Sequence, residues 1–92
     1  MKIENVLQPG KTYTVNAAMF GAMRTAYLAC VPATGQGATP AEIQKAVIPL
    51  LPQDLFPGGD KVGWWAKAAQ LDLEAKGVIR RAPTAPVRLT KV

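Results

Sequence analysis

The chain has 92 residues, a net charge of +5 and 49% apolar residues, and it contains no serine and no histidine. Without histidine it has no imidazole base, no Ser-His-Asp or Cys-His nucleophilic pair and no histidine ligand for zinc or iron. The one cysteine, Cys30, excludes an internal disulfide and a CxxC motif and favours a reducing compartment. We therefore expect a cytoplasmic protein that is not an enzyme and that needs no metal and no cofactor.

The length fits a single domain over 1–92, because a chain of this size can bury one modest core. The first ten residues include Glu4 and Pro9 where a signal peptide needs an apolar run, and no stretch approaches the ~18 apolar residues of a spanning helix. We therefore expect no contact with a membrane. Residues 60–92 hold seven basic and three acidic side chains, so a polyanionic partner should meet this C-terminal third.

The N-terminal half predicts two short strands and two helices. Strands over 3–7 and 11–15 flank a Pro9-Gly10 turn, so residues 1–15 form an arm or a hairpin. A helix follows over 16–30, with Asn16 as its cap and apolar residues repeating at helical spacing: Met19, Met23, Ala26, Tyr27 and Cys30. The segment Thr39-Pro40-Ala41-Glu42 combines a capping threonine, a first-turn proline and a reciprocal glutamate, which predicts a second helix that ends or kinks near Pro49.

A third helix is predicted from Asp60, as its cap, to Lys76, with Gly77 in the left-handed position after its end. A linker over 52–59 precedes it, and we expect one short turn of helix within that linker near Gln53 to Phe56. Helical spacing gives two apolar arcs and one polar arc between them. The apolar arcs are Trp64, Ala68, Leu71, Ala75 and Val62, Ala66, Ala69, Leu73, and the polar arc is Gly63, Lys67, Gln70, Glu74.

Two features of this helix lead to specific expectations. Trp64 and Trp65 could form a stacking platform for bases, but we expect at least one in the core, with Trp64 on the arc of Leu71. Asp72 lies among apolar neighbours, so it should be buried with an ion-pair partner, Arg80 or Arg81, or with a backbone hydrogen bond.

The C-terminal segment 78–92 predicts a basic hairpin. A strand over 78–81 and a proline-containing turn over 82–85 precede the alternation of Val87 and Leu89 with Arg88 and Thr90. Three helices followed by a β-hairpin give an α+β fold that resembles the winged helix-turn-helix, in which the hairpin is the wing. The resemblance is clearest from Trp64 through Gly77 to Arg81, which is similar to the third helix and first wing strand of winged-helix domains of the restriction-enzyme accessory type.

Together with Leu55-Phe56-Pro57-Gly58-Gly59, that segment also resembles a family of small bacterial proteins of unknown function. This second resemblance covers most of the chain and implies no activity. The interval from Pro49 to Gly59 is longer than the roughly 3 to 4 residues that join the helices of a simple helix-turn-helix. The crossing angle of the second and third helices therefore depends on how this insertion folds.

The winged-helix resemblance implies binding of duplex DNA, in the role of a regulator or of an accessory protein. Under this hypothesis the third helix enters the major groove, with Lys61 and Lys67 on phosphate or guanine and Gln70 on an adenine edge. The wing would contact the backbone or minor groove through Arg80, Arg81, Arg88 and Lys91. Because Asp60, Lys67 and Glu74 give the polar arc a net negative charge, the wing should supply most of the electrostatic affinity.

Simpler alternatives accompany each of these assignments. The basic residues can be solvated charges that keep a small domain soluble. The chain can also be a protein-interaction or homodimeric assembly module of the same fold, docking through the apolar surface of the first helix, the N-terminal hairpin or an exposed tryptophan. Cys30 is expected to be a small buried apolar residue without catalytic reactivity.

Overall fold

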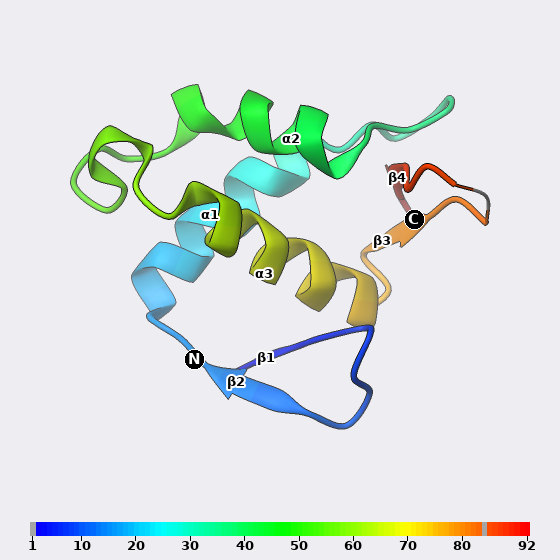
Figure 1. Cartoon of the computed structure of the whole chain (residues 1–92), viewed down its shortest axis with the longest axis horizontal. Coiled ribbons are helices and arrows are strands. Elements are labelled where there is room, and N and C mark those ends of the chain that lie inside the picture. The colour runs from blue at the N-terminus through cyan, green and yellow to red at the C-terminus, as the bar shows by residue number, and fades with distance from the viewer. Residues whose placement is uncertain (1, 84) are drawn as a thin grey trace.

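The computed structural model describes residues 2–83 and 85–92 (Figure 1). Two short strands come first, and a long helix, a short helix, two 3₁₀ turns, a third helix and two further strands follow. In chain order they are β1 Lys2–Glu4, β2 Thr12–Thr14, α1 Ala17–Cys30, α2 Pro40–Val47, η1 Ile48–Leu50, η2 Pro57–Gly59, α3 Val62–Ala75, β3 Ile79–Arg81 and β4 Leu89–Lys91. The fold is α+β, as predicted, and three helices followed by a C-terminal hairpin are consistent with a winged-helix-like layout.

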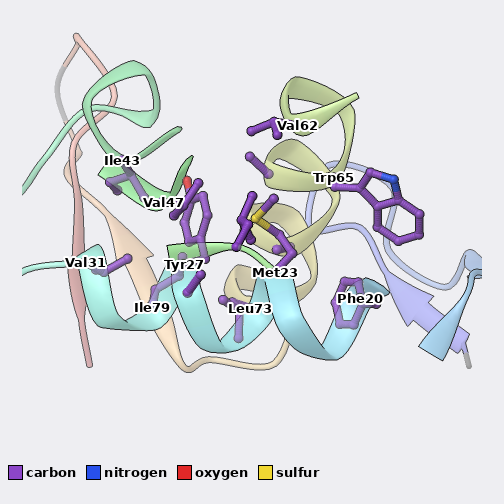
Figure 2. Packing of buried hydrophobic residues seen from close by; sticks show 14 of the residues in the cluster. Phe20, Met23, Tyr27, Val31, Ile43, Val47, Val62, Trp65, Leu73 and Ile79 are labelled. Atoms are coloured by element: carbon purple, nitrogen blue, oxygen red, sulfur yellow. The ribbon is translucent and has the colours of Figure 1, made fainter. Parts of the chain in front are cut away.

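The helices pack around α3, which lies between α2 and the N-terminal hairpin in Figure 1. Both hairpins are antiparallel, and their registers pair Ile3 with Tyr13 in the first and Arg80 with Thr90 in the second. Figure 2 shows the core where α1, α2 and α3 meet. It is built from apolar side chains that include Phe20, Met23, Tyr27, Ile43, Val47, Phe56, Trp65, Leu73, Ile79 and Leu89.

The starts of α1 and α2 confirm the predicted caps. Asn16 Oδ1 accepts the Met19 N–H at 3.0 Å. In α2 the Glu42 N–H donates to Thr39 Oγ1 at 3.2 Å, and Glu42 Oε1 accepts the Thr39 N–H at 2.8 Å. These bonds satisfy backbone donors that have no partner within a helix, so both starts are locally encoded. The α-helical part of α2 ends at Val47, and Pro49 lies in the 3₁₀ turn that follows, as predicted.

The entry to α3 differs from the prediction. Residues 52–56 form the expected single turn, in which the Phe56 N–H donates to the Pro52 carbonyl at 3.0 Å, but a 3₁₀ helix that was not predicted follows at Pro57–Gly59. Asp60 does not cap α3, because the helix begins one residue too late for it, after Lys61, and the Asp60 N–H closes the preceding 3₁₀ turn on Pro57. The residue before the helix is Lys61 in the left-handed conformation, with no side-chain cap. The turn into α3 therefore depends on the left-handed backbone conformation of Lys61 and not on a side-chain cap.

The exposed face of α3 matches the predicted polar arc only at Gly63 and Lys67. One tryptophan is in the core, as predicted, but it is Trp65, 8% exposed, whereas Trp64 is 59% exposed. Gln70 is 1% exposed, although the prediction placed it on the polar arc. The reason is that α1, α2, β1 and β3 all pack on this helix and leave exposed only Gly63, Trp64, Lys67 and Ala75.

The N-terminal hairpin is attached to α3 through Asp72. This carboxylate is fully buried, accepts the Glu4 N–H at 2.7 Å and pairs with the Lys76 ammonium at 2.9 Å. A buried Asp72 with an ion pair and a backbone bond is thus confirmed, but the choice of Arg80 or Arg81 as partner was wrong. Lys76 lies one turn further along the same helix and reaches the carboxylate without any tertiary arrangement.

Candidate functional site

The four basic residues of the wing, residues 78–92, do not play the same role. Arg80 and Lys91 are exposed, and Arg88 is half-buried. Arg81 instead faces Glu74 of α3, whose side chain is almost completely buried. The Arg81 Nε–H donates to Glu74 Oε1 at 2.5 Å and Nη2 to Oε2 at 2.8 Å, a bidentate pair that fixes the wing against α3.

This pair has electrostatic consequences for its neighbours. The hydrogen bonds to Glu74 raise the pKa of Arg81, and Tyr27 has its pKa raised by burial and by the same carboxylate. Gln70 also donates to Glu74 Oε2, at 3.1 Å. Arg81 therefore has a structural role, and its positive charge is balanced by Glu74. Gln70 is held in the interior and cannot reach an adenine edge, which corrects its assignment as a base reader.

Beside the wing lies a concavity of about 300 Å³, which we call the wing pocket. One wall is the loop between α1 and α2, and the other is the wing itself. The lining residues are Gly35, Gln36, Arg80, Arg81, Ala82, Pro83, Arg88 and Thr90. Sequence reasoning selected the arginines but missed the loop, because nothing local indicates that residues 35 and 36 meet the wing.

The loop is held against β4 by backbone contacts. The Ala38 N–H donates to the Leu89 carbonyl at 3.1 Å, the Leu89 N–H donates back at 2.8 Å, and the Lys91 N–H donates to the Pro32 carbonyl at 2.9 Å. Gly37 has φ +83°, and a Cβ there would lie 2.7 Å from the Leu89 carbonyl oxygen. The loop can approach this closely only because position 37 is glycine.

The arginines of the wing pocket differ in how far they are paired. Arg88 Nη1 lies 4.0 Å from Glu42 Oε1, and both side chains are at least partly exposed. The pKa of Glu42 is lowered, first by the backbone hydrogen bond from Thr39, then by its hydroxyl, and least by Arg88. Arg80 makes no ion pair within residues 2–83 and 85–92. The wing pocket therefore keeps positive charge that the neighbouring carboxylates do not neutralise.

The predicted helix residues lie apart from this cluster. Lys61 is exposed immediately before α3, and Lys67 is exposed in the first half of the helix. The helix has 14 residues and is thus about 20 Å long, and the wing follows its other end. A smaller concavity of about 200 Å³ between β1 and α3 is lined by Lys67, Trp64, Ala68, Leu71 and residues 3–5. The structure thus brings Arg80, Arg81 and Arg88 together but leaves the two lysines separate from them.

An apolar groove follows the outer face of α1. It encloses about 540 Å³ and is lined by small side chains and by residues of the segment after α2: Gly21, Ala22, Thr25, Ala26, Ala29, Leu50 and Pro52. Leu50 is exposed at its edge.

Cys30, at the end of α1, is half-buried, and burial raises the pKa of its thiol. The thiol is therefore predominantly protonated at neutral pH.

Comparison with known proteins gives a family but no activity. Residues 1–89 match DUF6958, a family of unknown function. The chain belongs to this family. No curated protein and no solved structure matches this DUF6958 chain. Across its described residues, no helix is long and apolar enough to span a bilayer, and no three His, Cys, Asp or Glu side chains gather in a group that could hold a metal.

Proposed function

We propose that this DUF6958 protein binds nucleic acid, duplex DNA in the first instance, through its wing. The supporting observation is the convergence of Arg80 and Arg88 on the wing pocket, with Lys91 exposed on the adjacent strand. Guanidinium groups pair with phosphate oxygens in a bidentate manner, and contacts of this kind supply most of the sequence-independent affinity for DNA.

The proposal differs from the winged-helix expectation in how α3 takes part. With Gln70 buried, the exposed residues of this helix are Gly63, Trp64, Lys67 and Ala75, which offer few groups that can read a base edge. Lys61 and Lys67 can still add phosphate contacts at the start of the helix. We therefore infer backbone binding with little sequence preference, in which the wing carries the larger share of the affinity.

The test is fluorescence anisotropy of a labelled random-sequence duplex at low salt. We expect saturable binding by the native chain and at least ten-fold weaker binding after the double substitution Arg80→Gln and Arg88→Gln. The matched control is Lys11→Gln with Lys45→Gln, which removes the same charge from exposed positions outside the wing. Equal weakening by both pairs would indicate a general charge effect, and absence of binding by the native chain would refute the proposal.

A second candidate function is homodimeric assembly through the α1 groove. The observation that favours it is that one chain offers both an apolar groove and the exposed Leu50 at its edge, as a twofold, self-complementary contact requires. Light scattering would then give twice the monomer mass of 9.8 kDa, and Ala29→Arg would restore the monomer. A monomeric native chain at high concentration would exclude this candidate.

A further inference from the structure

We propose that the wing pocket is a discrete site for a single phosphoryl group, with the loop residue Gln36 as part of it. This inference rests on the proposed function in that one backbone phosphate of a bound nucleic acid would occupy the site. It goes further because it states that the pocket binds one phosphoryl oxyanion per chain, including one carried by a small molecule.

Strand geometry places the donors on one face of the wing. Arg80 and Thr90 are direct partners in the β3–β4 register, so their side chains point to the same face. Arg88 is two residues before Thr90 and shares that face, because the Ala82 N–H bond to the Arg88 carbonyl at 2.8 Å continues the ladder. Two guanidinium groups and one hydroxyl therefore converge on the concavity.

The opposite wall supplies an amide and a turn. Gln36, exposed at the loop tip, lines the wing pocket beside Gly35. Its side-chain amide can donate a further hydrogen bond to an oxyanion. The volume of about 300 Å³ equals that of roughly ten water molecules, so it admits a phosphoryl group with part of the molecule that carries it.

The charges around the wing pocket favour an anion that enters it. The carboxylates nearest to its arginines are Glu74 and Glu42. Glu74 is bound in a bidentate pair with Arg81, and the exposed Glu42 reaches Arg88 only at 4.0 Å. A phosphate that accepts from Arg88 therefore replaces a weak, solvent-screened contact, whereas Arg80 has no carboxylate partner to lose within the described chain.

The site is also formed before any ligand binds. The bonds of Ala38 to Leu89 and of Lys91 to Pro32 fix the loop, and Glu74 fixes Arg81 at the back of the wing. The backbone of both walls is thus positioned before an anion binds, so that only the side chains of Arg80, Arg88 and Gln36 have to be ordered, and this separates the site from a diffuse basic surface.

The experiment is an NMR titration of the full ¹⁵N-labelled chain with inorganic phosphate at constant ionic strength, with chloride as the competing salt. We expect saturable shifts of the amides of Gly35, Gln36 and Thr90. Affinity should fall at least ten-fold in Arg88→Ala and several-fold in Gln36→Ala, and by less than two-fold in Lys11→Ala, which removes an exposed charge outside the wing. The amide spectrum of each variant also reports whether it is folded.

The outcomes separate this inference from the proposed function. If the chain binds DNA but phosphate causes only linear shifts equal to those from chloride, the phosphoryl site is refuted and DNA binding stands. If phosphate saturates the wing pocket but no duplex binds, the nucleic-acid proposal fails and the site stands. Titration with adenosine monophosphate then tests a small phosphorylated molecule as the source, and saturation at the same amides supports that assignment.

Discussion

Two buried carboxylates near the end of α3 hold the two hairpins. Asp72 and Glu74 are two residues apart and therefore project to different sides of the helix. Asp72 accepts from the first strand of the N-terminal hairpin, and Glu74 binds Arg81 of the wing. The same helix end thus attaches both hairpins to the core, and Glu74 positions the wing without contributing to ligand binding.

Substitutions at Asp72 should separate the role of its acceptor atom from that of its charge. Asp72→Ala leaves the Glu4 N–H without its acceptor and should destabilise the chain by about 2–3 kcal/mol. Asp72→Asn keeps a carbonyl oxygen for that N–H but loses the attraction to Lys76, and we expect it to cost about 1 kcal/mol. Urea unfolding measures both values. Equal losses in the two variants would show that the charge, not the backbone bond, holds the hairpin.

At the scale of elements, the loop between α1 and α2 depends on one close approach. Gly35 and Gly37 both have positive φ, but only at position 37 would a Cβ meet backbone, 2.7 Å from the Leu89 oxygen. Gly35→Ala should therefore cost about 1 kcal/mol of conformational strain, and Gly37→Ala clearly more, about 2–3 kcal/mol. Thermal unfolding of the two variants measures the loss of stability in each. Similar losses would mean that the loop does not pack on β4 as described.

The start of α2 should depend on pH through Glu42. Its pKa is lowered in the folded chain, chiefly by the Thr39 backbone bond, so the ionised form stabilises the fold. That contribution is complete above the ordinary carboxyl value of 4.5 and is lost as the pH falls through the lower folded value. An NMR titration of the Glu42 carboxyl should give a pKa below 4.5, and Thr39→Ala should raise it toward 4.5. A native value at or above 4.5 would contradict the capping box.

Local signals in the sequence predicted where most elements lie but not which of their faces are buried. The Asn16 cap, the Thr39–Glu42 capping box and the left-handed Gly77 depend only on neighbouring residues, and all three are present. Asp60 has the chemistry of a cap but is taken up by the preceding 3₁₀ turn. The residue type of a cap therefore predicts a helix start only where a preceding turn does not shift the first helical residue, as it does here to Val62.

At the scale of the molecule, tertiary packing determines which side chains are buried and which distant segments meet, and helical periodicity alone does not predict either. Helical spacing placed Trp64 on the apolar arc of Leu71, but the structure buries Trp65 instead, because the choice depends on where β1 and α2 pack on α3. The wing pocket likewise requires a loop at 33–37 to meet a strand at 89–91, a contact across more than fifty residues with no local signature. The wing arginines were predictable from charge, whereas the concavity between them and the loop was not.

The most direct test of phosphate binding by the wing is the salt dependence of the affinity for a random duplex. With each phosphate contact contributing about −0.9 to the log–log slope, Arg80, Arg88 and Lys91 alone predict about −2.7. Participation of Lys61 and Lys67 would bring the slope to about −4.5. We predict a slope in this range for the native chain, less steep by about 1.8 in the Arg80→Gln, Arg88→Gln variant. A slope near zero, or one that the double substitution leaves unchanged, would contradict the account.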